Sequence, residues 1–368
     1  MKNIIKDFQV KVVELELKKS WKISLYEQST RPHCIVKIIT EDGVVGYGEA
    51  SPSPAFMGET GYTMELAINR YLGPSIIGEN IFNIDNIHDK LDSAIYGNYA
   101  AKSAIDMALY DLMGKTLNVP VYKLLGGKYR DKIELSWVVG MQDLKGSIEE
   151  AKERLSEGYK VIKIKVGISP ERDIELLTKV REELGYGFPI RLDANQGYDY
   201  RTALTTFKKL EEFHLESIEQ PVKRSDIKGL KMLRERLDTP IMADESISNF
   251  HDVVNVVNND ACDIANIKVG KVGGLSQAKK IANYLEANGL HATAGSNLEV
   301  GLGAAASLHF VASSKYVDIP NDLYLGNILH KNDIIKEKYD LVDGCLTVPE
   351  KPGLGVEVND DIFDWYSV

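Results

Sequence analysis

The sequence predicts an α/β protein in which a (β/α)-barrel follows a smaller α+β domain. After residue 132, the chain of 368 residues alternates short apolar segments with amphipathic ones, as strands joined by helical crossovers do. Eight strands connected in this way favour a closed barrel over an open sheet. No glycine fingerprint of a dinucleotide-binding fold follows any of them. The predicted strands span residues 133–139, 161–166, 190–193, 215–219, 241–244, 263–268, 291–294 and 315–319.

The first third of the chain is predicted to contain strands and then helices. A hairpin turn at 41–43 joins two of the strands, and helical spacing begins at residue 63 and continues to residue 125. Loops with aromatic residues, such as 18–31 and 51–62, are usually connections, but they are also placed to close over a ligand. The predicted strands are 10–17, 34–40 and 44–50. The predicted units are an α+β domain at 1–127, a barrel at 128–325 and a tail at 326–368.

The composition is that of a globular protein, with 44% apolar and 27% charged residues. A net charge of −10 argues against a nucleic-acid-binding surface, which would need a basic excess. Cys34, Cys262 and Cys345 are far apart and odd in number, which suits reduced thiols. The N-terminus has no apolar signal region, and no apolar run approaches the length of a membrane span. We therefore expect a cytoplasmic protein without a membrane partner, and the sequence leaves a homo-oligomer open.

The stretch 161–167 places two cations on one face of a strand. Lys163 and Lys165 alternate with branched apolar residues, so both ammonium groups leave the same side of the sheet. Taken alone, this pattern is more typical of an edge strand that carries lysines against aggregation. The charged residues that end the following strands favour a functional interpretation.

A periodic series of charged residues follows this stretch. The intervals are 28 residues from Lys165 to Asp193, 26 to Glu219, 25 to Asp244 and 24 to Lys268, and each is the length of one βα unit. In a barrel these residues would converge at the carboxyl ends of the strands, where the active sites of this architecture lie. A single acidic residue at a strand end is usually a helix cap. Charged residues at five consecutive strand ends favour a functional site over helix capping.

The chemistry of this predicted ring indicates a magnesium ion. Three carboxylates in a partly dehydrated pocket need a cation, and an all-oxygen set suits Mg²⁺. Because no His or Cys accompanies the three carboxylates, zinc is disfavoured. A lysine acts as a base only when neutral, so its pKa must fall from about 10.4 toward about 7 to 8. A metal ion and a second ammonium group nearby would lower it.

The motifs that contain these residues resemble those of the enolase superfamily, and in particular its muconate lactonizing enzyme subgroup. That superfamily is itself a standard example of a lysine or histidine base acting beside Mg²⁺. The similarity covers nearly the whole chain. The motifs are Lys163-Ile-Lys165, Asp193-Ala-Asn195-Gln196, Ile218-Glu219-Gln220-Pro221, Ala243-Asp244-Glu245-Ser246, Ile267-Lys268-Val-Gly-Lys-Val-Gly273-Gly274, Gly46-Tyr-Gly48-Glu49-Ala50 and the tail motif 348–355.

The resemblance implies a modified (β/α)7β barrel whose mouth is capped by the 1–127 domain, with the tail returning to that domain. It implies that Asp193, Glu219 and Asp244 hold Mg²⁺, and that Lys165 and Lys268 are acid and base on opposite faces of the substrate. The metal would bind the substrate carboxylate and stabilise the enediolate that forms when the α-proton leaves. Asn195 and Glu245 are expected to support the ligands. The substrate-binding positions that it implies are Lys163, Ser136, Tyr26, Ser296, Leu298, Asp318 and Asp322.

Several reactions are compatible with this resemblance. Two opposed lysines suit the 1,1-proton transfer of epimerases and racemases, and the stretch 53–60 resembles the capping loop of dipeptide epimerases. The substrate predicted in this way is a dipeptide such as L-Ala-L-Glu, with its ammonium group on Asp318 and Asp322 and its second carboxylate near Lys22 or Arg31. Muconate cycloisomerase, o-succinylbenzoate synthase and N-acylamino acid racemase are the alternatives. A non-catalytic barrel that binds a small acid is a further alternative, which the loss of a lysine or carboxylate would favour, and none is lost.

Overall fold

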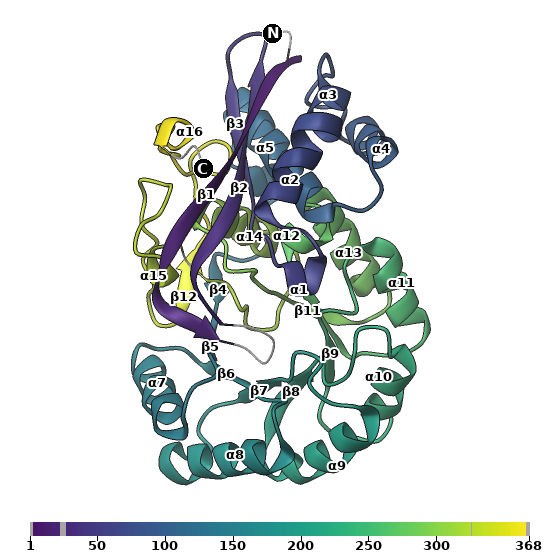
Figure 1. The fold of residues 1–368 in the computed structure, drawn as a ribbon, viewed down its shortest axis with the longest axis vertical. Helices are drawn as coiled ribbons and strands as arrows, with labels where there is room; N and C mark the ends of the chain where they lie inside the picture. The colour runs from purple at the N-terminus through teal and green to yellow at the C-terminus, as the bar shows by residue number, and fades with distance from the viewer. Residues whose placement is uncertain (1–2, 23–26, 325, 366–368) are drawn as a thin grey trace.

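Seven parallel strands curl into the wall of a barrel in the lower half of Figure 1. The computed structural model describes residues 3–22, 27–324 and 326–365. The strands lie in the order β11-β10-β9-β8-β7-β6-β5, so each pairs with its sequence neighbour. They are β5 (Ser136–Val139), β6 (Val161–Lys165), β7 (Ile190–Asp193), β8 (Leu215–Glu219), β9 (Ile241–Ala243), β10 (Ile264–Ile267) and β11 (His291–Ala294).

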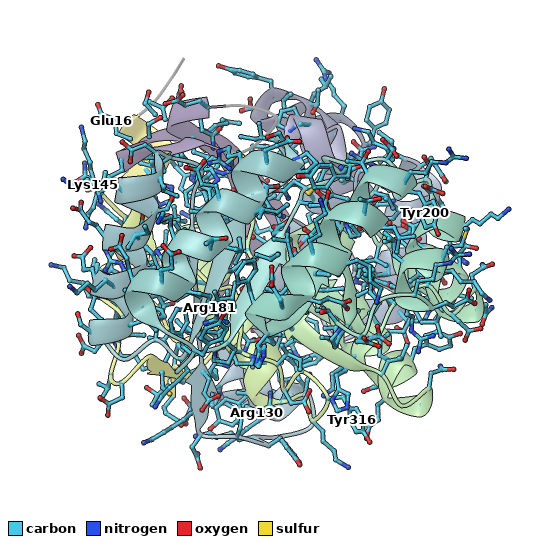
Figure 2. All side chains as sticks on the ribbon, turned by 90° about the horizontal axis from the view of Figure 1, so that it is seen from below. Glu16, Arg130, Lys145, Arg181, Tyr200 and Tyr316 are labelled. Carbon is cyan, nitrogen blue, oxygen red and sulfur yellow. The ribbon has the colours of Figure 1, made fainter. Side chains whose placement is uncertain are left out.

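Helices cover the outside of this wall and separate its strands along the chain. Leu176, Leu177 and Val180 of one such helix are buried on its inner side, as the amphipathic spacing predicted. Figure 2, seen from below, shows the side chains around the outer helices, with Arg181 and Tyr200 labelled. The helices are α7 (Leu144–Ser156), α8 (Pro170–Leu184), α9 (Tyr200–Leu210), η2 (Glu211–Phe213), α10 (Ile227–Arg234), α11 (Phe250–Asn258), α12 (Val269–Val272), α13 (Leu275–Ala287) and α14 (Gly301–Ala312).

The eighth predicted strand, 315–319, is not a regular strand. Isolated bridges instead join Val317 to Ala292, Asp322 to Gly295 and Asn321 to Leu135, so the segment still closes the barrel. Pro320 has no N–H to give to a ladder. The Asn321 side chain replaces ladder bonds, because its Oδ1 accepts from the Ala294 N–H at 2.8 Å and its Nδ2 donates to the Glu134 carbonyl at 3.2 Å. The (β/α)7β barrel is confirmed, with this segment in place of an eighth strand.

The N-terminal domain packs helices against a three-stranded antiparallel sheet above the barrel (Figure 1). Its helix α5 lies so close to β3 that a Cβ on Gly48 would sit 1.9 Å from the Ala104 carbonyl oxygen. Glycine is therefore required there. The elements are β1 (Ile5–Lys22), β2 (Glu27–Thr40), β3 (Val45–Ala50), α1 (Pro54–Met57), α2 (Gly61–Ala67), η1 (Ile68–Leu72), α3 (Gly73–Ile76), α4 (Ile84–Ala94), α5 (Tyr99–Leu117) and α6 (Val121–Leu124).

Two predicted boundaries in the first half of the chain need correction. Most of the expected loop 18–31 belongs to β1 and β2, which stay paired out to Lys22 and Glu27 after a register shift between Glu16 and Trp21. The predicted strand 133–139 is divided, because β4 (Lys132–Glu134) turns away to pair with β12 (Cys345–Thr347) of the tail. The second correction comes from a pairing partner more than 200 residues away, which local spacing does not reveal.

The C-terminal tail returns to the N-terminal domain. Asp111 of α5 accepts a hydrogen bond from the Leu354 N–H at 2.9 Å, and the Gly353 carbonyl accepts from the Val121 N–H at 2.9 Å. Buried His309 of the barrel helix α14 connects the barrel with the N-terminal domain and the tail. Its Nδ1 accepts from the Tyr122 N–H at 3.2 Å, and its Nε2 lies 3.1 Å from the Leu354 carbonyl oxygen. The remaining short helices are α15 (Gly326–Leu329) and α16 (Ile362–Trp365).

Within the described ranges, none of the helices has the length and apolar character needed to cross a membrane.

The histidine at this junction should make stability depend on pH. Burial lowers the pKa of His309 to about 4, whereas an unfolded histidine titrates near about 6.5. Between these values the unfolded chain binds the proton and the native chain does not, so stability falls as pH falls from about 6.5 to about 4. The quantity to compare is the free energy of unfolding in urea of the wild type and of His309→Gln. Over this pH range we expect it to change less in the variant, with slopes that differ by up to about 1.4 kcal/mol per pH unit. Equal slopes for both proteins would contradict this assignment.

Candidate active site

Five charged side chains meet at the carboxyl edge of the barrel strands. Lys165, Asp193 and Glu219 are the last residues of β6, β7 and β8, and Asp244 and Lys268 directly follow β9 and β10. The three carboxylates are only 1%, 0% and 1% exposed. Because neighbouring parallel strands end at the same edge, these residues are positioned by the sheet rather than by loops.

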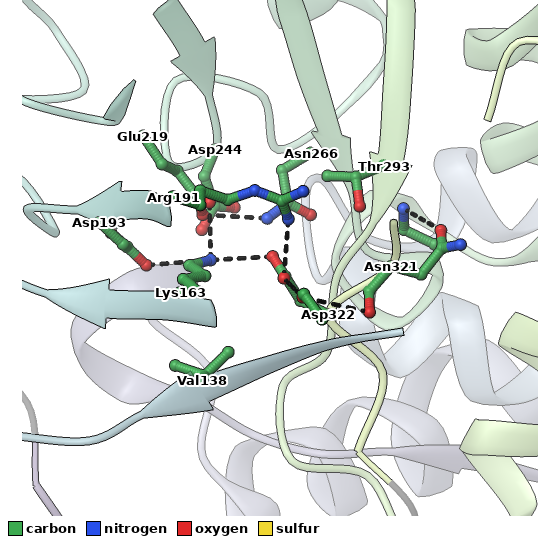
Figure 3. A network of polar contacts seen from close by, with 12 residues as sticks. Val138, Lys163, Arg191, Asp193, Glu219, Asp244, Asn266, Thr293, Asn321 and Asp322 are labelled. Carbon is green, nitrogen blue, oxygen red and sulfur yellow. Dashed lines mark hydrogen bonds and ion pairs between the residues drawn. The ribbon is translucent and has the colours of Figure 1, made fainter. Parts of the chain in front are cut away.

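Lys163 links several of these carboxylates at the centre of the barrel (Figure 3). Its Nζ lies 2.6 Å from Glu219 Oε2, 2.9 Å from Asp322 Oδ2 and 3.2 Å from Asp193 Oδ2. Burial alone would lower the pKa of Lys163, but attraction to Asp322, Glu219 and Asp193 outweighs burial and raises this pKa well above its usual value. Among these protein groups, the ammonium form of Lys163 is therefore favoured.

The two other lysines reach the site from opposite sides of the barrel. Lys165 Nζ donates to Asp193 Oδ2 at 2.5 Å and to Asn195 Oδ1 at 2.8 Å. Lys268 Nζ donates to Asp244 Oδ2 at 2.7 Å. The strands that carry them, β6 and β10, are separated by three others in the sheet. A molecule between them would have an amine on each face.

The electrostatics around Lys268 oppose the pKa expected of a base. Burial lowers the pKa of Lys268, but Asp244 and then Glu219 attract its proton and raise the pKa overall. The fall toward neutrality that the sequence led us to expect depends on positive charge that shields these carboxylates. The protein groups alone therefore do not produce a neutral base at this lysine.

The donor set fits a divalent cation by its chemistry. Burial and then repulsion by Asp193 raise the pKa of Glu219 to about 8. Burial and then Asp244 raise the pKa of Glu245 to about 7, and Glu245 Oε2 is buried without a hydrogen-bond partner. In the described part of the chain, no three His, Cys, Asp or Glu side chains form a ready-made metal site. The carboxylates are paired with lysine side chains, so a bound cation would replace lysine ammonium groups as their partner.

A small cavity of about 60 Å³ has Lys163 and Asp193 among its lining residues. Lys165 and Lys268 line it from two sides, and Arg31, Ser53 and Phe56 of the N-terminal domain line it from above. Arg31 donates to Ser51 Oγ at 2.9 Å and to the Pro52 carbonyl at 2.7 Å, which fixes the capping segment. The cavity therefore has a charged floor and a roof contributed by another domain.

Three residues at or near the cavity have a left-handed backbone conformation. Asn195, Gln220 and Leu298 have φ values of 41°, 37° and 63°, in a region that residues other than glycine rarely adopt. Such positions cost of order 1–3 kcal/mol each and cluster at functional sites. Asn195 lies two residues after Asp193 of β7, and Gln220 directly follows Glu219 of β8.

The other predicted substrate-binding residues are placed as follows. Ser296, Leu298 and Asp322 line the cavity, and Ser136 donates to Asp322 Oδ1 below it. Tyr26 lies outside the described residues.

Asp318 requires a correction, because it is not at the cavity. It pairs with His291 at 2.9 Å, and His291 begins β11, so the pair is at the amino end of the barrel. The side chains of His291 and Asp318 are 49% and 39% exposed. Asp322 occupies the carboxyl end, because Pro320 and Asn321 interrupt the regular strand between the two aspartates. Asp318 is therefore not in position to bind an ammonium group of the substrate.

Three residues that the sequence interpretation did not assign complete the charge network. Arg191 donates to Asp322 Oδ1 at 2.8 Å and to Glu216 Oε2 at 2.9 Å. Asn266 donates to Glu219 Oε1 at 2.9 Å, and Lys271 Nζ lies 2.6 Å from Asp244 Oδ1. Alternation could have identified the first two, which precede Asp193 and Lys268 by two residues on the same strand face. Lys271 lies three residues after Lys268 in α12.

Family models match both parts of the chain and define its class. The mandelate racemase and muconate lactonizing enzyme N-terminal domain matches residues 7–126, and the enolase C-terminal domain-like model matches residues 146–362. The chain therefore belongs to the enolase superfamily, and the resemblance stated from the motifs is confirmed.

Named relatives within this family are similar over most of the chain. An N-succinyl-L-Arg/Lys racemase from Bacillus cereus is 36% identical and covers 95% of this chain and 94% of its own. An L-Ala-D/L-Glu epimerase from Clostridium acetobutylicum is 35% identical over 96% and 99%. A hydrophobic dipeptide epimerase from Enterococcus faecalis is 37% identical over 85% and 88%. These relatives are isomerases, and we class this chain as an isomerase.

Solved structures are also similar to this chain over most of its length. The N-succinyl Arg/Lys racemase from Bacillus cereus has a TM-score of 0.95 over 99% of this chain and 98% of its own, at 34% identity. The dipeptide epimerase from Enterococcus faecalis, in complex with Mg and L-Leu-L-Tyr, has a TM-score of 0.92 over 96% and 99%, also at 34% identity.

The pair of Arg191 and Asp322 should be strongly coupled. Replacing Arg191 with Met leaves the buried carboxylate of Asp322 and the partly buried carboxylate of Glu216 with less compensation. Breaking a buried pair costs about 3–5 kcal/mol. We expect the double variant Arg191→Met/Asp322→Asn to lose less stability than the sum of the two single variants. Denaturant unfolding of the four proteins gives the coupling energy. Additive losses would show that the contact has no energetic role.

Proposed function

We propose that this chain inverts the α-carbon of an N-substituted amino acid by transferring a proton between opposite faces. The observation that carries the proposal is the position of Lys165 and Lys268, which line one cavity from strands on opposite sides of the barrel. A base held on one face of a fixed substrate cannot deliver a proton to the other face. Two opposed lysines meet this requirement.

In this proposal, the two lysines transfer protons and the capping residues exclude water. On one face a neutral lysine, Lys165 or Lys268, accepts the α-proton at Nζ. The other, in its ammonium form, donates a proton from its Nζ to the opposite face. The capping residues Arg31 and Phe56 exclude water above the reacting carbon. Bound Mg²⁺, which Asp193, Glu219 and Asp244 would hold, supplies positive charge to anchor the substrate carboxylate and to offset the charge that develops as the proton leaves.

Two substrate classes have support. Dipeptides are favoured by the names of two relatives, the L-Ala-D/L-Glu epimerase and the hydrophobic dipeptide epimerase. Arg31 at the cavity is a partner for an acidic side chain such as that of L-Ala-L-Glu. N-acylamino acids are favoured by the location of Asp318 away from the cavity and by the N-succinyl-L-Arg/Lys racemase. Cycloisomerisation is the alternative reaction. It is supported by the similarity to a muconate cycloisomerase from Rhodococcus opacus, which is 31% identical over 95% of both chains.

Metal binding can be tested without activity. We expect Mg²⁺ to raise the melting temperature of the EDTA-dialysed protein, since a ligand at 100 times its dissociation constant stabilises by about 2.7 kcal/mol. The variants Asp193→Asn and Asp244→Asn should lose most of this shift because each removes a ligand charge. Asp318→Asn is the matched control and should keep it. Activity that survives exhaustive EDTA dialysis would argue against a metal-dependent reaction.

The two-base assignment predicts a stereochemical difference between lysine variants. Lys165→Ala and Lys268→Ala should each lower epimerisation about 10²–10⁴-fold, while each still exchanges the α-proton of one stereoisomer with D₂O. Proton NMR of both stereoisomers measures the exchange. Lys145→Ala, in an exposed part of α7, is the control and should be fully active. Full activity in either of the two site variants would show that only one lysine acts.

A further inference from the structure

A second, larger cavity lies beside the catalytic one. Its volume is about 510 Å³, against about 60 Å³ for the catalytic cavity, which is within the usual range of small-molecule sites. Residues of β1, β5, α7 and α15 line it, on the left side of Figure 1. Within the described part of the chain, Trp21 alone lines both cavities. We refer to this second space as the outer cavity.

The lining of the outer cavity is largely apolar and partly aromatic. The apolar residues that line it are Trp21, Trp137, Met141, Ile328 and Leu329. An aromatic ring packs favourably against tryptophan rings and against the sulfur of a methionine. Burial of an apolar group against these side chains adds to its binding. The outer cavity therefore suits a ligand with an aromatic body.

The charged groups of the outer cavity leave two ammonium groups for a ligand. Among the described residues, no carboxylate pairs with Lys18 or Lys19, which both line this cavity and are exposed. The third cation, Arg154, is already paired with Glu157 at 2.5 Å. The acid in the lining, Glu150, accepts hydrogen bonds from neighbouring side chains at both oxygens, at 2.8 and 2.6 Å. The charge that is free to meet a ligand is therefore positive, which favours a carboxylate.

An unpaired acceptor adds a further requirement. Asn327 lines the outer cavity, and its Oδ1 is buried without a hydrogen-bond partner in the ranges that the structure describes. A buried acceptor is costly when it is left unpaired. The backbone carbonyl of the same residue accepts from Lys18 Nζ at 2.7 Å, so this acceptor and an ammonium group lie within one residue of each other. A ligand that meets both needs a hydroxyl donor next to its carboxylate.

We propose that the outer cavity binds an aromatic 2-hydroxy acid, at a site separate from that of the substrate. The aromatic ring packs against the tryptophans, the carboxylate faces Lys18 and Lys19, and the hydroxyl group donates to Asn327 Oδ1. An amino group in place of the hydroxyl group is disfavoured, because it would bring a further cation beside the two lysines. The compound 3-phenyllactate has the required groups and serves as the probe.

An aromatic partition connects this site to the catalytic cavity. Tyr324 lines the catalytic cavity, and its ring centroid lies 5.2 Å from that of Trp21 and 6.0 Å from that of Trp137. Both tryptophans line the outer cavity. A ligand that packs against them therefore contacts the side chains that hold Tyr324 in place. Binding in the outer cavity should alter turnover in the catalytic cavity without blocking it, and this consequence rests on the proposed function.

Calorimetric titration of the wild-type protein tests the site without turnover. We expect saturable binding of 3-phenyllactate at one site per chain. The compound 3-phenylpropane-1,2-diol has a hydroxymethyl group in place of the carboxylate and should bind about 2- to 10-fold more weakly, as for the loss of two exposed ion pairs. The compound 3-phenylpropanoate lacks only the hydroxyl group and should also bind about 2- to 10-fold more weakly, as for one hydrogen bond. No saturable binding, or equal affinity for all three compounds, would overturn the proposal.

Variants of the two cavities locate the ligand. The double variant Lys18→Ala/Lys19→Ala should bind 3-phenyllactate about as weakly as the wild type binds the diol, while Lys145→Ala on α7 is the matched control and should bind normally. Ile328→Trp fills the outer cavity and should abolish binding, and its melting temperature shows whether it folds. The exposed lysine variants remain decisive if it does not. Binding that is lost in Lys268→Ala and kept in the double variant would place the ligand in the catalytic cavity and overturn the proposal.

Kinetics give a second readout that separates this proposal from the proposed function. A ligand in the outer cavity should change kcat at saturating substrate, by at least about fivefold for a typical coupling between sites, whereas a competitor for the catalytic cavity leaves kcat unchanged. Strictly competitive inhibition by 3-phenyllactate would therefore overturn the separate site. If the chain exchanges no α-proton with any substrate, the proposed function fails, and the calorimetric titrations still decide whether the outer cavity binds the acid.

Discussion

The balance of buried charge around Lys163 is the constraint on which the site depends. Its ammonium group lies within 3.2 Å of oxygens from Asp193, Glu219 and Asp322. A buried charge is tolerated only when it is paired, so each member fixes the position of the next. Arg191 compensates Asp322 from below, and Asn266 satisfies Glu219. The floor of the cavity is therefore positioned by mutually paired buried charges.

The capping domain depends on the same barrel edge through buried polar contacts. Glu49 of β3 accepts hydrogen bonds from the Val300 and Gly303 N–H groups, at 2.8 and 2.7 Å, at the start of α14. The N-terminus of a helix is a favourable place for a carboxylate. Ser51 donates to the Asn297 carbonyl at 2.7 Å, while Arg31 holds Ser51. The roof of the cavity is thus aligned with the floor by groups that would be costly to leave unpaired.

The sequence was informative where the structure is periodic. The intervals from Lys165 to Lys268 predicted which side chains lie together, because each βα unit returns the chain to the same edge. The role that the resemblance implied for Asp318 was wrong, because Pro320 removes a ladder donor and the Asn321 side chain takes over pairing between Asp318 and Asp322. The extension of β1 and β2 through Trp21 and Gln28 was also missed, since pairing across the sheet decides it. The pKa of Lys268 depends on charges from three strands, which no local pattern contains.

The two ends of the cavity have separable roles. The lysines and carboxylates come from strand ends, where the barrel fixes their geometry, and they carry the chemistry common to carboxylate substrates. Trp21, Leu298 and Tyr324 also line this cavity, but they come from β1, the loop before α14 and the segment after the closing bridges, whereas the neighbouring Val138 belongs to β5. We expect a change of residue in these elements to alter which substituent fits with less effect on the charge network beneath. We propose this separation as a physical reason why similar chains within the family have the names of racemases, epimerases and cycloisomerases.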